Sequence, residues 1–326
     1  MFMPSMKKAS FEVALKSKKQ IAEGTYEFVF EKPKGFSFKA GQHIRMTLLN
    51  PPETDTKGNS RFLTLANTPQ DKDLVVAMRI SDSAFKRVLY NLKIGNKILI
   101  QILLGVPHGA FALHEDSSRP AVMLTGGIGI VPAYSMIKDA TQRRLPYKIF
   151  LFYSNRRPED TPYLDELKKF EKQNPNFKLI ATMTEDKAWK GETGFIDQSM
   201  LKKYVNDLNS PIYYIAGLTG MVNAMKTLLK GVGVNEDNIK AEDFSGFKMG
   251  LMKDIADNTK KHLPFAVIGL MVIIGVVLHL GAAVSMFDTN SFKNLSYFTI
   301  GLILIIVIFK VFVIKHFLSF KHGKKG

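Results

Sequence analysis

The segment Val122–Ile137, VMLTGGIGIVPAYSMI, brings three glycines to the point where an apolar strand meets a helix. Gly126, Gly127 and Gly129 lack the Cβ atoms that would keep backbone amides away from a phosphate group. The helix adds partial positive charge at its N-terminus, and Pro132 suits its first turn. The pattern is not a full G-x-G-x-x-G, and a tight strand–helix turn is the simpler alternative. It predicts a pyrophosphate site formed by Thr125, Gly126, Gly127, Ile128 and Gly129.

Two later strand ends carry residues that suit the same ligand class. One ends in a hydroxyl, an amide and two guanidinium groups: Ser154, Asn155, Arg156 and Arg157. A dinucleotide fold often has an acid here for the ribose 2′-hydroxyl, whereas arginine can bind a 2′-phosphate with two hydrogen bonds. NADH and NADPH both stay open, as does a solvated role for the arginines. The other end offers small residues at a strand edge: Gly217, Leu218, Gly220 and Met221.

The elements that must hold these residues change character near residue 116. Before it, short β-branched, aromatic and aliphatic stretches alternate with turn residues, which predicts an antiparallel barrel or sandwich. The expected strands are residues 11–15, 26–30, 43–48, 62–66, 74–80 and 97–102, with a helix near 83–92. After it, strands at 121–124, 148–153, 177–182 and 212–216 alternate with helices near 132–142, 161–173, 198–204 and 220–229. That alternation predicts a doubly wound α/β sheet with parallel strands.

The C-terminal part of the chain is strongly apolar. No Asp, Glu, Lys or Arg lies between Lys261 and Asp288, and a second apolar run, residues 295–314, has Lys310 as its one charge. Each run reaches the roughly 20 residues that a bilayer requires. This predicts transmembrane helices at about 264–286 and 295–314, with two buried core helices as the alternative. Lysines lie outside both ends of the pair, so both termini are expected in the cytoplasm.

The charge and the absence of cysteine limit the kinds of catalysis and partner that the chain can have. The 326 residues carry a formal net charge of +16 and no cysteine, which excludes thiolate catalysis and cysteine-ligated iron–sulfur clusters within them. The basic charge suits anionic lipid or an acidic partner, and the absence of a nucleic-acid-binding motif argues against nucleic acid. His279 is the one histidine of the first apolar run, so a bis-histidine haem is not expected. The N-terminus has no apolar run of signal-peptide length.

The order of motifs resembles the ferredoxin–NADP reductase superfamily over roughly residues 10–247. The resemblance is carried by FKAGQHI (38–44), RFLT (61–64), TGGIGIVP (125–132), AGLTGM (216–221) and EDFSGF (242–247). It implies a β-barrel domain that binds FAD, residues 1–115, and an α/β domain that binds NAD(P)H, residues 116–250. The membrane anchor would then occupy residues 251–326.

The resemblance also implies roles for individual residues. Arg61 would contact the FAD pyrophosphate, Phe62 and Leu63 would continue the flavin site, and Thr64 would hydrogen-bond near flavin N5. Leu63 stands where the family usually has an aromatic residue. Glu242 would lie near the flavin edge and Phe247 near its face, so Thr64 and Glu242 are the expected catalytic residues. Ala216 replaces a cysteine that lies near the nicotinamide in many members.

A flavin-phosphate loop and helix are expected at MRIS and SAFK (78–81 and 83–86). The residues concerned are Met78, Arg79, Ser83, Ala84, Phe85 and Lys86, and Lys86 stands where the family often has Ser or Thr. Backbone amides at the helix start could bind phosphate, with Arg79 and Lys86 as counter-charges. Ser83 could instead be a helix N-cap alone.

These motifs together predict a membrane-tethered flavoprotein reductase. Electrons would pass from NAD(P)H through FAD to a membrane-associated acceptor such as a quinone, a haem protein, or a membrane oxygenase or desaturase. The departures at Leu63, Lys86 and Ala216 favour an alternative, a non-enzymatic nucleotide-sensing or assembly subunit of a membrane redox complex. No metal site is expected, because no metal-ligand spacing is present.

Overall fold

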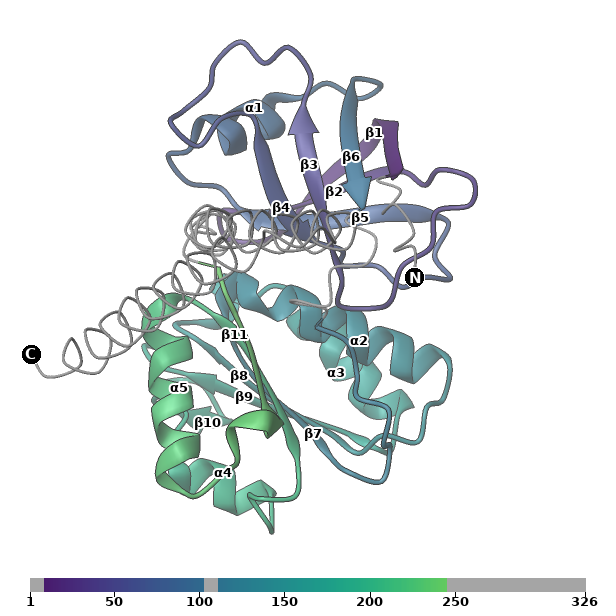
Figure 1. Ribbon diagram of the computed structural model, residues 1–326. Helices are drawn as coiled ribbons and strands as arrows, with labels where there is room; N and C mark the ends of the chain where they lie inside the picture. Colours follow the sequence, from purple (N-terminus) through teal and green to yellow (C-terminus); the bar gives the residue numbers. More distant parts are fainter. Residues whose placement is uncertain (1–8, 103–110, 245–326) are drawn as a thin grey trace, which may run out of the picture. The chain divides into compact units, whose positions relative to one another are not determined.

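The computed structural model describes residues 9–102 and 111–244 (Figure 1). The chain divides into two units, residues 1–247 and 248–326, and every described residue lies in the first. Both predicted membrane spans, 264–286 and 295–314, fall outside the described residues. Among the residues that are described, no helix has the length and apolar character needed to cross a bilayer.

The N-terminal region forms a six-stranded antiparallel sheet with the order β4-β3-β6-β1-β2-β5. A bridge between Leu65 and Val76 joins the two ends of this order, because these residues lie at β4 and on β5. The sheet therefore closes on itself as a barrel. Its elements are β1 (Ala9–Ala22), β2 (Thr25–Glu31), β3 (His43–Leu48), β4 (Ser60–Thr64), β5 (Asp73–Arg79), α1 (Ala84–Asn91) and β6 (Lys97–Ile102).

Alternation along the strands builds the barrel core. In β3 the side chains of Ile44, Met46 and Leu48 are buried, whereas Arg45 between them is exposed. Side chains of a strand point to opposite faces in turn, so the HIRMTL sequence places one apolar row inside. The buried Phe28 and Phe30 of β2 follow the same rule.

The second region is a six-stranded sheet, entirely parallel, with the order β10-β9-β8-β7-β11-β12. Its strands are β7 (Ala121–Gly126), β8 (Ile149–Asn155), β9 (Phe177–Met183), β10 (Glu192–Thr193), β11 (Ile212–Gly217) and β12 (Ile239–Asp243). Its helices are α2 (Ile130–Gln142), α3 (Leu164–Gln173), α4 (Gln198–Tyr204) and α5 (Thr219–Gly231). Three short 3-10 turns lie at Gly127–Gly129, Pro158–Asp160 and Glu236–Asn238.

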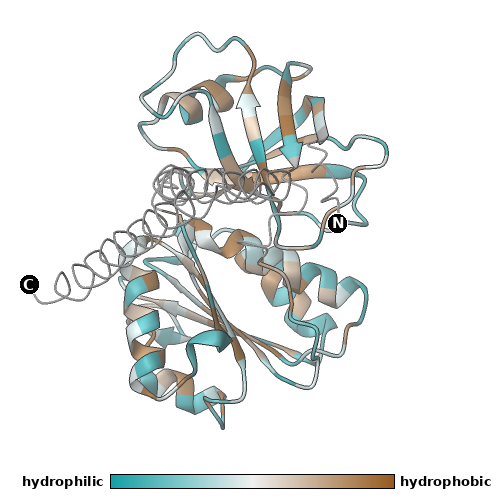
Figure 2. Ribbon diagram, viewed as in Figure 1, coloured by the Kyte–Doolittle hydropathy of each residue, from teal (hydrophilic) through white to brown (hydrophobic). Residues whose placement is uncertain are grey.

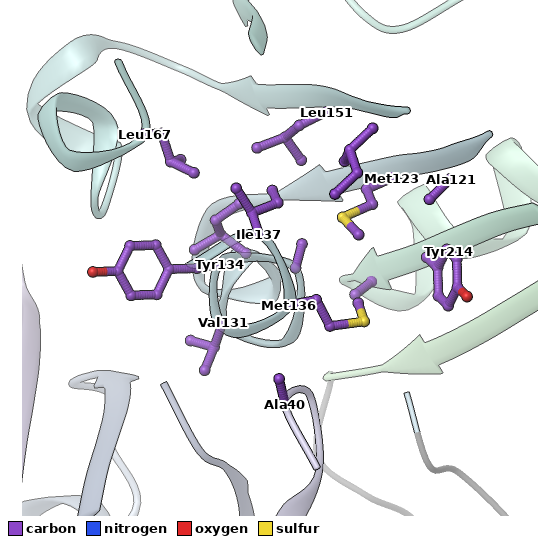
Figure 3. Close-up of a cluster of buried hydrophobic side chains, with 14 of the residues drawn as sticks. Ala40, Ala121, Met123, Val131, Tyr134, Met136, Ile137, Leu151, Leu167 and Tyr214 are labelled. Atoms are coloured by element: carbon purple, nitrogen blue, oxygen red, sulfur yellow. The ribbon is translucent and has the colours of Figure 1, made fainter. Parts of the chain in front are cut away.

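Two apolar layers cover this sheet. Helices α2 and α3 pack on one face with alternate residues of β7, β8 and β11, and α4 and α5 pack on the other. Figure 3 shows Ile137 of α2 pointing toward the side of the sheet residues Leu151 and Met123, and Met136 extending toward the side of Tyr214. Figure 2 shows that α5 carries both hydrophilic and hydrophobic residues along its length, as expected for a helix with one face on the sheet. The parallel doubly wound sheet predicted from the sequence is thereby confirmed.

The barrel contacts the first helix of the α/β region through polar and apolar groups. The buried Ser135 hydroxyl accepts a hydrogen bond from the Gly41 amide (3.2 Å) and donates to the Asn67 carbonyl oxygen (2.7 Å). Ala40 belongs to the same apolar cluster as Met136 (Figure 3). The residues after β7 are thus held close to the barrel.

Three predicted elements are present with other bounds. The helix expected at 161–173 begins at Leu164, because Tyr163 has a left-handed backbone (φ 60°) that a helix cannot continue through. The strand expected at 62–66 lies at Ser60–Thr64, and the first strand runs to Ala22. Strands β10 and β12 were missed, and two residues make β10 too short to show a pattern.

Candidate functional site

The C-terminal edge of the parallel sheet collects buried polar atoms that have no partner. Within the described residues, four buried side-chain polar atoms make no hydrogen bond, and three lie at this edge: Thr125 Oγ1, Asn155 Nδ2 and Glu242 Oε1. They end β7, β8 and β12, and Ala216 of β11 aligns with both Thr125 and Glu242. Buried polar groups are normally hydrogen-bonded. Their concentration here marks this edge as a ligand site.

The glycine turn fits a pyrophosphate. Gly127 has a left-handed backbone (φ +53°) and a Cβ added to it would meet nothing within 4 Å, so open space lies beside it. A Cβ on Gly129 would lie 2.4 Å from the Ala216 carbonyl oxygen. Gly129 thus lets the start of α2 approach β11 closely, and α2 has no acidic residue in its first turn. A phosphate binds where backbone amides meet an open helix start.

The predicted segment Gly217–Met221 also lies at the C-terminal edge of the parallel sheet. Gly217 ends β11, and a Cβ on Gly126 would lie 2.6 Å from Met221 Sδ. Leu218 precedes α5 and leaves 67% of its surface exposed. The predicted residues Thr125–Gly129 and Gly217–Met221 therefore line one edge, with an apolar side chain free to pack on a ligand.

The two arginines after β8 are already paired. Arg156 Nη2 lies 3.1 Å from Asp160 Oδ1, and Arg157 Nε lies 3.3 Å from Asp160 Oδ2. Arg157 Nη2 also lies 2.8 Å from Glu23 Oε2, and Arg79 Nη2 lies 3.4 Å from Asp160 Oδ1, so the cluster links the barrel to the α/β region. Burial alone would raise the pKa of Asp160, but the hydrogen bond from Arg157 and the arginine charges outweigh it and lower that pKa.

The two predicted catalytic residues, Thr64 and Glu242, both lie next to His43. Thr64 is buried at the end of β4 and aligns with His43 on β3, whose Nδ1 lies 4.0 Å from Glu242 Oε1. Phe62 packs edge-on against the His43 ring (5.4 Å between centroids). Strands β3 and β4 of the barrel and the last strand of the parallel sheet therefore converge. Sequence reasoning missed His43, although it lies inside the FKAGQHI motif.

Burial dominates the electrostatics of this pair. It raises the pKa of Glu242 to about 8 and lowers the pKa of His43. Both side chains therefore favour their neutral forms near pH 7, and Glu242 holds a proton there. A buried acid of this kind at a ligand edge is a recurrent mark of a functional site.

The predicted FAD-phosphate residues also come together, around a carboxylate. Arg61 Nη2 donates to both oxygens of Asp55 (2.8 Å each), and the Ser83 hydroxyl donates to Asp55 Oδ2 (3.2 Å). Arg61 lies over the Phe85 ring (5.2 Å). A guanidinium fork, a hydroxyl and a helix start are a donor set that fits phosphate oxygens. Ser83 does not cap α1 with its side chain.

Other predicted contacts are structural. The side chains of Met78, Ala84 and Phe85 are buried in the barrel core, so only their backbone could touch a ligand. Lys86 Nζ donates to the Arg79 carbonyl oxygen (2.8 Å). Leu63 is partly buried and packs on the same core. Phe247 lies outside the described residues.

Comparison with known proteins agrees with this geometry. The family described as "Oxidoreductase NAD-binding domain" matches residues 123–227. A subunit of the Na(+)-translocating NADH-quinone reductase of Methylococcus capsulatus is 26% identical over 72% of this chain and 68% of its own length. Reductase component 1 of the terephthalate 1,2-dioxygenase of Comamonas is 25% identical over 64% of this chain. This chain spans 60% of that relative's length.

Solved structures share the fold. A cytochrome P450 reductase of Amycolatopsis superimposes with a TM-score of 0.62 at 20% identity, over 74% of this chain and 71% of the other. A ferredoxin–NADP⁺ reductase of Neisseria gonorrhoeae, solved with FAD and NADP, gives 0.58 at 21% identity over 72% and 98% of the two chains. The ferredoxin–NADP reductase-like fold is therefore confirmed. The matches to an oxidoreductase NAD-binding domain and to reductase components also bear out the predicted enzyme class, an NAD(P)H oxidoreductase.

Proposed function

We propose that this chain is a membrane-tethered flavoprotein reductase that passes electrons from NAD(P)H through FAD to an acceptor at the membrane. The observation that carries the proposal is the meeting of two edges. The parallel sheet meets the barrel where Glu242 Oε1 lies 4.0 Å from Nδ1 of His43, the residue that aligns with Thr64 across β3 and β4. The glycine turn and the other unpartnered polar atoms lie along the same edge of the sheet. Such a junction suits a nicotinamide nucleotide that packs against a flavin.

FAD supplies the redox chemistry in this proposal, because it accepts two electrons together and can release them singly. The protein's own residues bind and orient. The turn at Gly127 and the start of α2 would bind the coenzyme pyrophosphate, and Thr125 would donate to or accept from the coenzyme at the strand end. Arg61 and Ser83 would bind the FAD pyrophosphate. Glu242 would hold a proton beside the flavin edge, since its pKa is raised to about 8.

The acceptor is proposed to lie in or at the membrane. The two apolar runs at 264–286 and 295–314 support a tether, and their basic flanks favour a cytoplasmic position for the catalytic region and both termini. The relatives include a subunit of a quinone reductase and a reductase component of a dioxygenase, which supports a quinone or an oxygenase-type partner. These 326 residues contain no cysteine for an iron–sulfur cluster, so electrons would leave directly from the flavin.

Anaerobic reduction of the purified full chain tests the proposal. We expect the detergent-solubilised protein to bind FAD and the flavin absorbance to bleach on addition of NADH or NADPH. Membranes that contain the protein should retain it after alkaline carbonate washing and should reduce added quinone. A protein that binds FAD but turns over with neither donor, using ferricyanide as acceptor, would favour a nucleotide-sensing subunit instead. Release by carbonate would refute the tether alone.

A further inference from the structure

Asp55 occupies the place where an anionic ligand of the barrel would bind. Its carboxylate accepts four hydrogen bonds: from the Lys57 amide (2.9 Å), twice from Arg61 Nη2 (2.8 Å each) and from the Ser83 hydroxyl (3.2 Å). Both carboxylate oxygens are thus used. We call the two side-chain donors, Arg61 and Ser83, the anion seat. Its pattern is the one that proteins offer to phosphate oxygens.

The start of α1 explains why the anion seat attracts a negative group. Helix α1 has no acidic residue in its first turn, and Ser83, the N-cap residue before it, directs its hydroxyl to Asp55 rather than to the helix backbone. The partial positive charge of the helix end is therefore balanced by Asp55, which reaches it from the loop between β3 and β4. The hydrogen bond from Arg61 is the largest cause that lowers the pKa of Asp55, so the carboxylate stays ionised.

Arg61 cannot serve two anions with the same atoms. Its Nη1 donates to three backbone carbonyl oxygens, those of Lys57 (3.1 Å), Gly58 (2.9 Å) and Ser60 (2.8 Å). Its Nη2 is used by Asp55. A phosphate that took the guanidinium fork would have to replace the carboxylate, because two anions at this distance repel each other and only one set of donors is present.

We propose that Asp55 is an internal anion that competes with the FAD pyrophosphate for the anion seat and so sets the affinity of the chain for FAD. The inference rests on the proposed function, which makes FAD the ligand of the barrel. Loading of FAD then exchanges one anion for another: the phosphate enters, and the Asp55 carboxylate turns out toward solvent. The loop start stays in place, because Glu53 pairs with Arg87 of α1 (Nε–Oε1 3.0 Å).

The test compares Asp55→Asn with Asp82→Asn in the full chain, by titrating each apoprotein with FAD and following flavin fluorescence. The asparagine side chain keeps the size of the aspartate but cannot compete as an anion, so we expect Asp55→Asn to lower the dissociation constant about tenfold. Asp82 is a matched control: it carries the same charge, lies one residue before Ser83 and pairs with Arg87 rather than Arg61. Asp82→Asn should change the constant by less than about twofold.

A measurement on the wild-type protein keeps the inference testable if a variant does not fold. We expect hydrogen exchange of the amides in residues 55–58 to become faster when FAD binds, because the Lys57 amide loses its bond to Asp55. Protection of that segment by FAD, or an Asp55→Asn variant that folds and binds FAD no more tightly, would overturn the inference and leave the proposed function intact. No FAD binding by either protein would overturn both.

Discussion

The two ligand edges of this molecule differ in how their polar groups are satisfied. At the end of the parallel sheet, Thr125 Oγ1 and Glu242 Oε1 are buried without a hydrogen-bond partner among the described residues. In the barrel, Arg61 has every hydrogen bond of its Nη1 and Nη2 atoms made, by Asp55 and by three carbonyl oxygens. The first edge is organised for a ligand before one arrives, whereas the second must exchange an internal partner for its ligand.

The difference follows from what builds each edge. The sheet edge rests on backbone: strand ends in register, a glycine turn and a helix start fix the positions of Thr125 and Glu242. The anion seat is made of two side chains, which can pair with the loop residue Asp55 when no ligand is present. The two edges should therefore respond differently to substitution, and four predictions test this in order of expected effect.

The largest effect is expected at the glycine turn. In Gly129→Ala the added Cβ would lie 2.4 Å from the Ala216 carbonyl oxygen and 2.7 Å from Gly217 Cα, both backbone atoms that cannot yield cheaply. We expect overpacking to cost about 1–3 kcal/mol of unfolding free energy. Thermal denaturation should show a loss of about 2–4 °C for each kcal/mol. Gly231→Ala is the control, since a Cβ there meets nothing within 4 Å and it ends a helix. A Gly129→Ala variant as stable as the wild type would contradict a rigid edge.

The next largest effect is expected at Arg61. Arg61→Ala removes the fork that would bind the FAD pyrophosphate and also leaves Asp55 as an unpaired anion at the seat. Charge-assisted hydrogen bonds contribute about 1.5–3 kcal/mol, so the FAD dissociation constant should rise roughly 10- to 100-fold. Arg45→Ala is a suitable control, because Arg45 lies on the neighbouring strand with an exposed side chain. FAD titration measures both, and equal affinities would show that Arg61 does not touch the cofactor.

How much of this could be read from the sequence depends on the range of the interactions. The glycine turn, the strand ends and the two sheets were predicted because their signals are local: spacing, alternation and turn residues. The sequence did not predict that Asp55 pairs with Arg61. It also did not predict that Asp160 pairs with arginines of the barrel and of the α/β region. These contacts arise between loops that the fold brings together, and nothing in DTKGN or RRPED says which charge will meet which. Strand β12 was missed because it needs β11 beside it to form.

A smaller effect is expected from pH at the sheet edge. Burial raises the pKa of Glu242 from 4.5 to about 8, so the folded protein binds a proton there that the unfolded chain releases. Stability from this group is complete below pH 4.5 and is lost as pH rises toward 8. Between pH 7 and 8 the free energy of unfolding should fall by about 1 kcal/mol. His43 does not contribute to this change, because burial lowers its pKa below its ordinary value. Urea denaturation at the two pH values should show it in the wild type and not in Glu242→Gln. The same slope in both would place the titrating group elsewhere.

The smallest effect is expected at Thr125, and Thr182 of the same sheet is its control. Thr125 and Thr182 are both buried, but the Thr182 hydroxyl donates to the Gly194 carbonyl oxygen (2.7 Å) and the Thr125 hydroxyl has no partner among the described residues. Thr125→Val should leave the stability of the ligand-free protein unchanged within about 0.5 kcal/mol and weaken NAD(P)H binding about 2- to 10-fold, the range of one neutral hydrogen bond. Thr182→Val should do the reverse, with a stability loss of about 1–3 kcal/mol and unchanged coenzyme affinity.

Denaturation and coenzyme titration of these two threonine variants give four numbers. A stability loss in Thr125→Val without any change in coenzyme binding would mean that its hydroxyl has a structural partner. In that case the sheet edge would no longer differ from the barrel by having unpartnered polar groups. The comparison would then rest on the pairing of Asp55 with the anion seat alone.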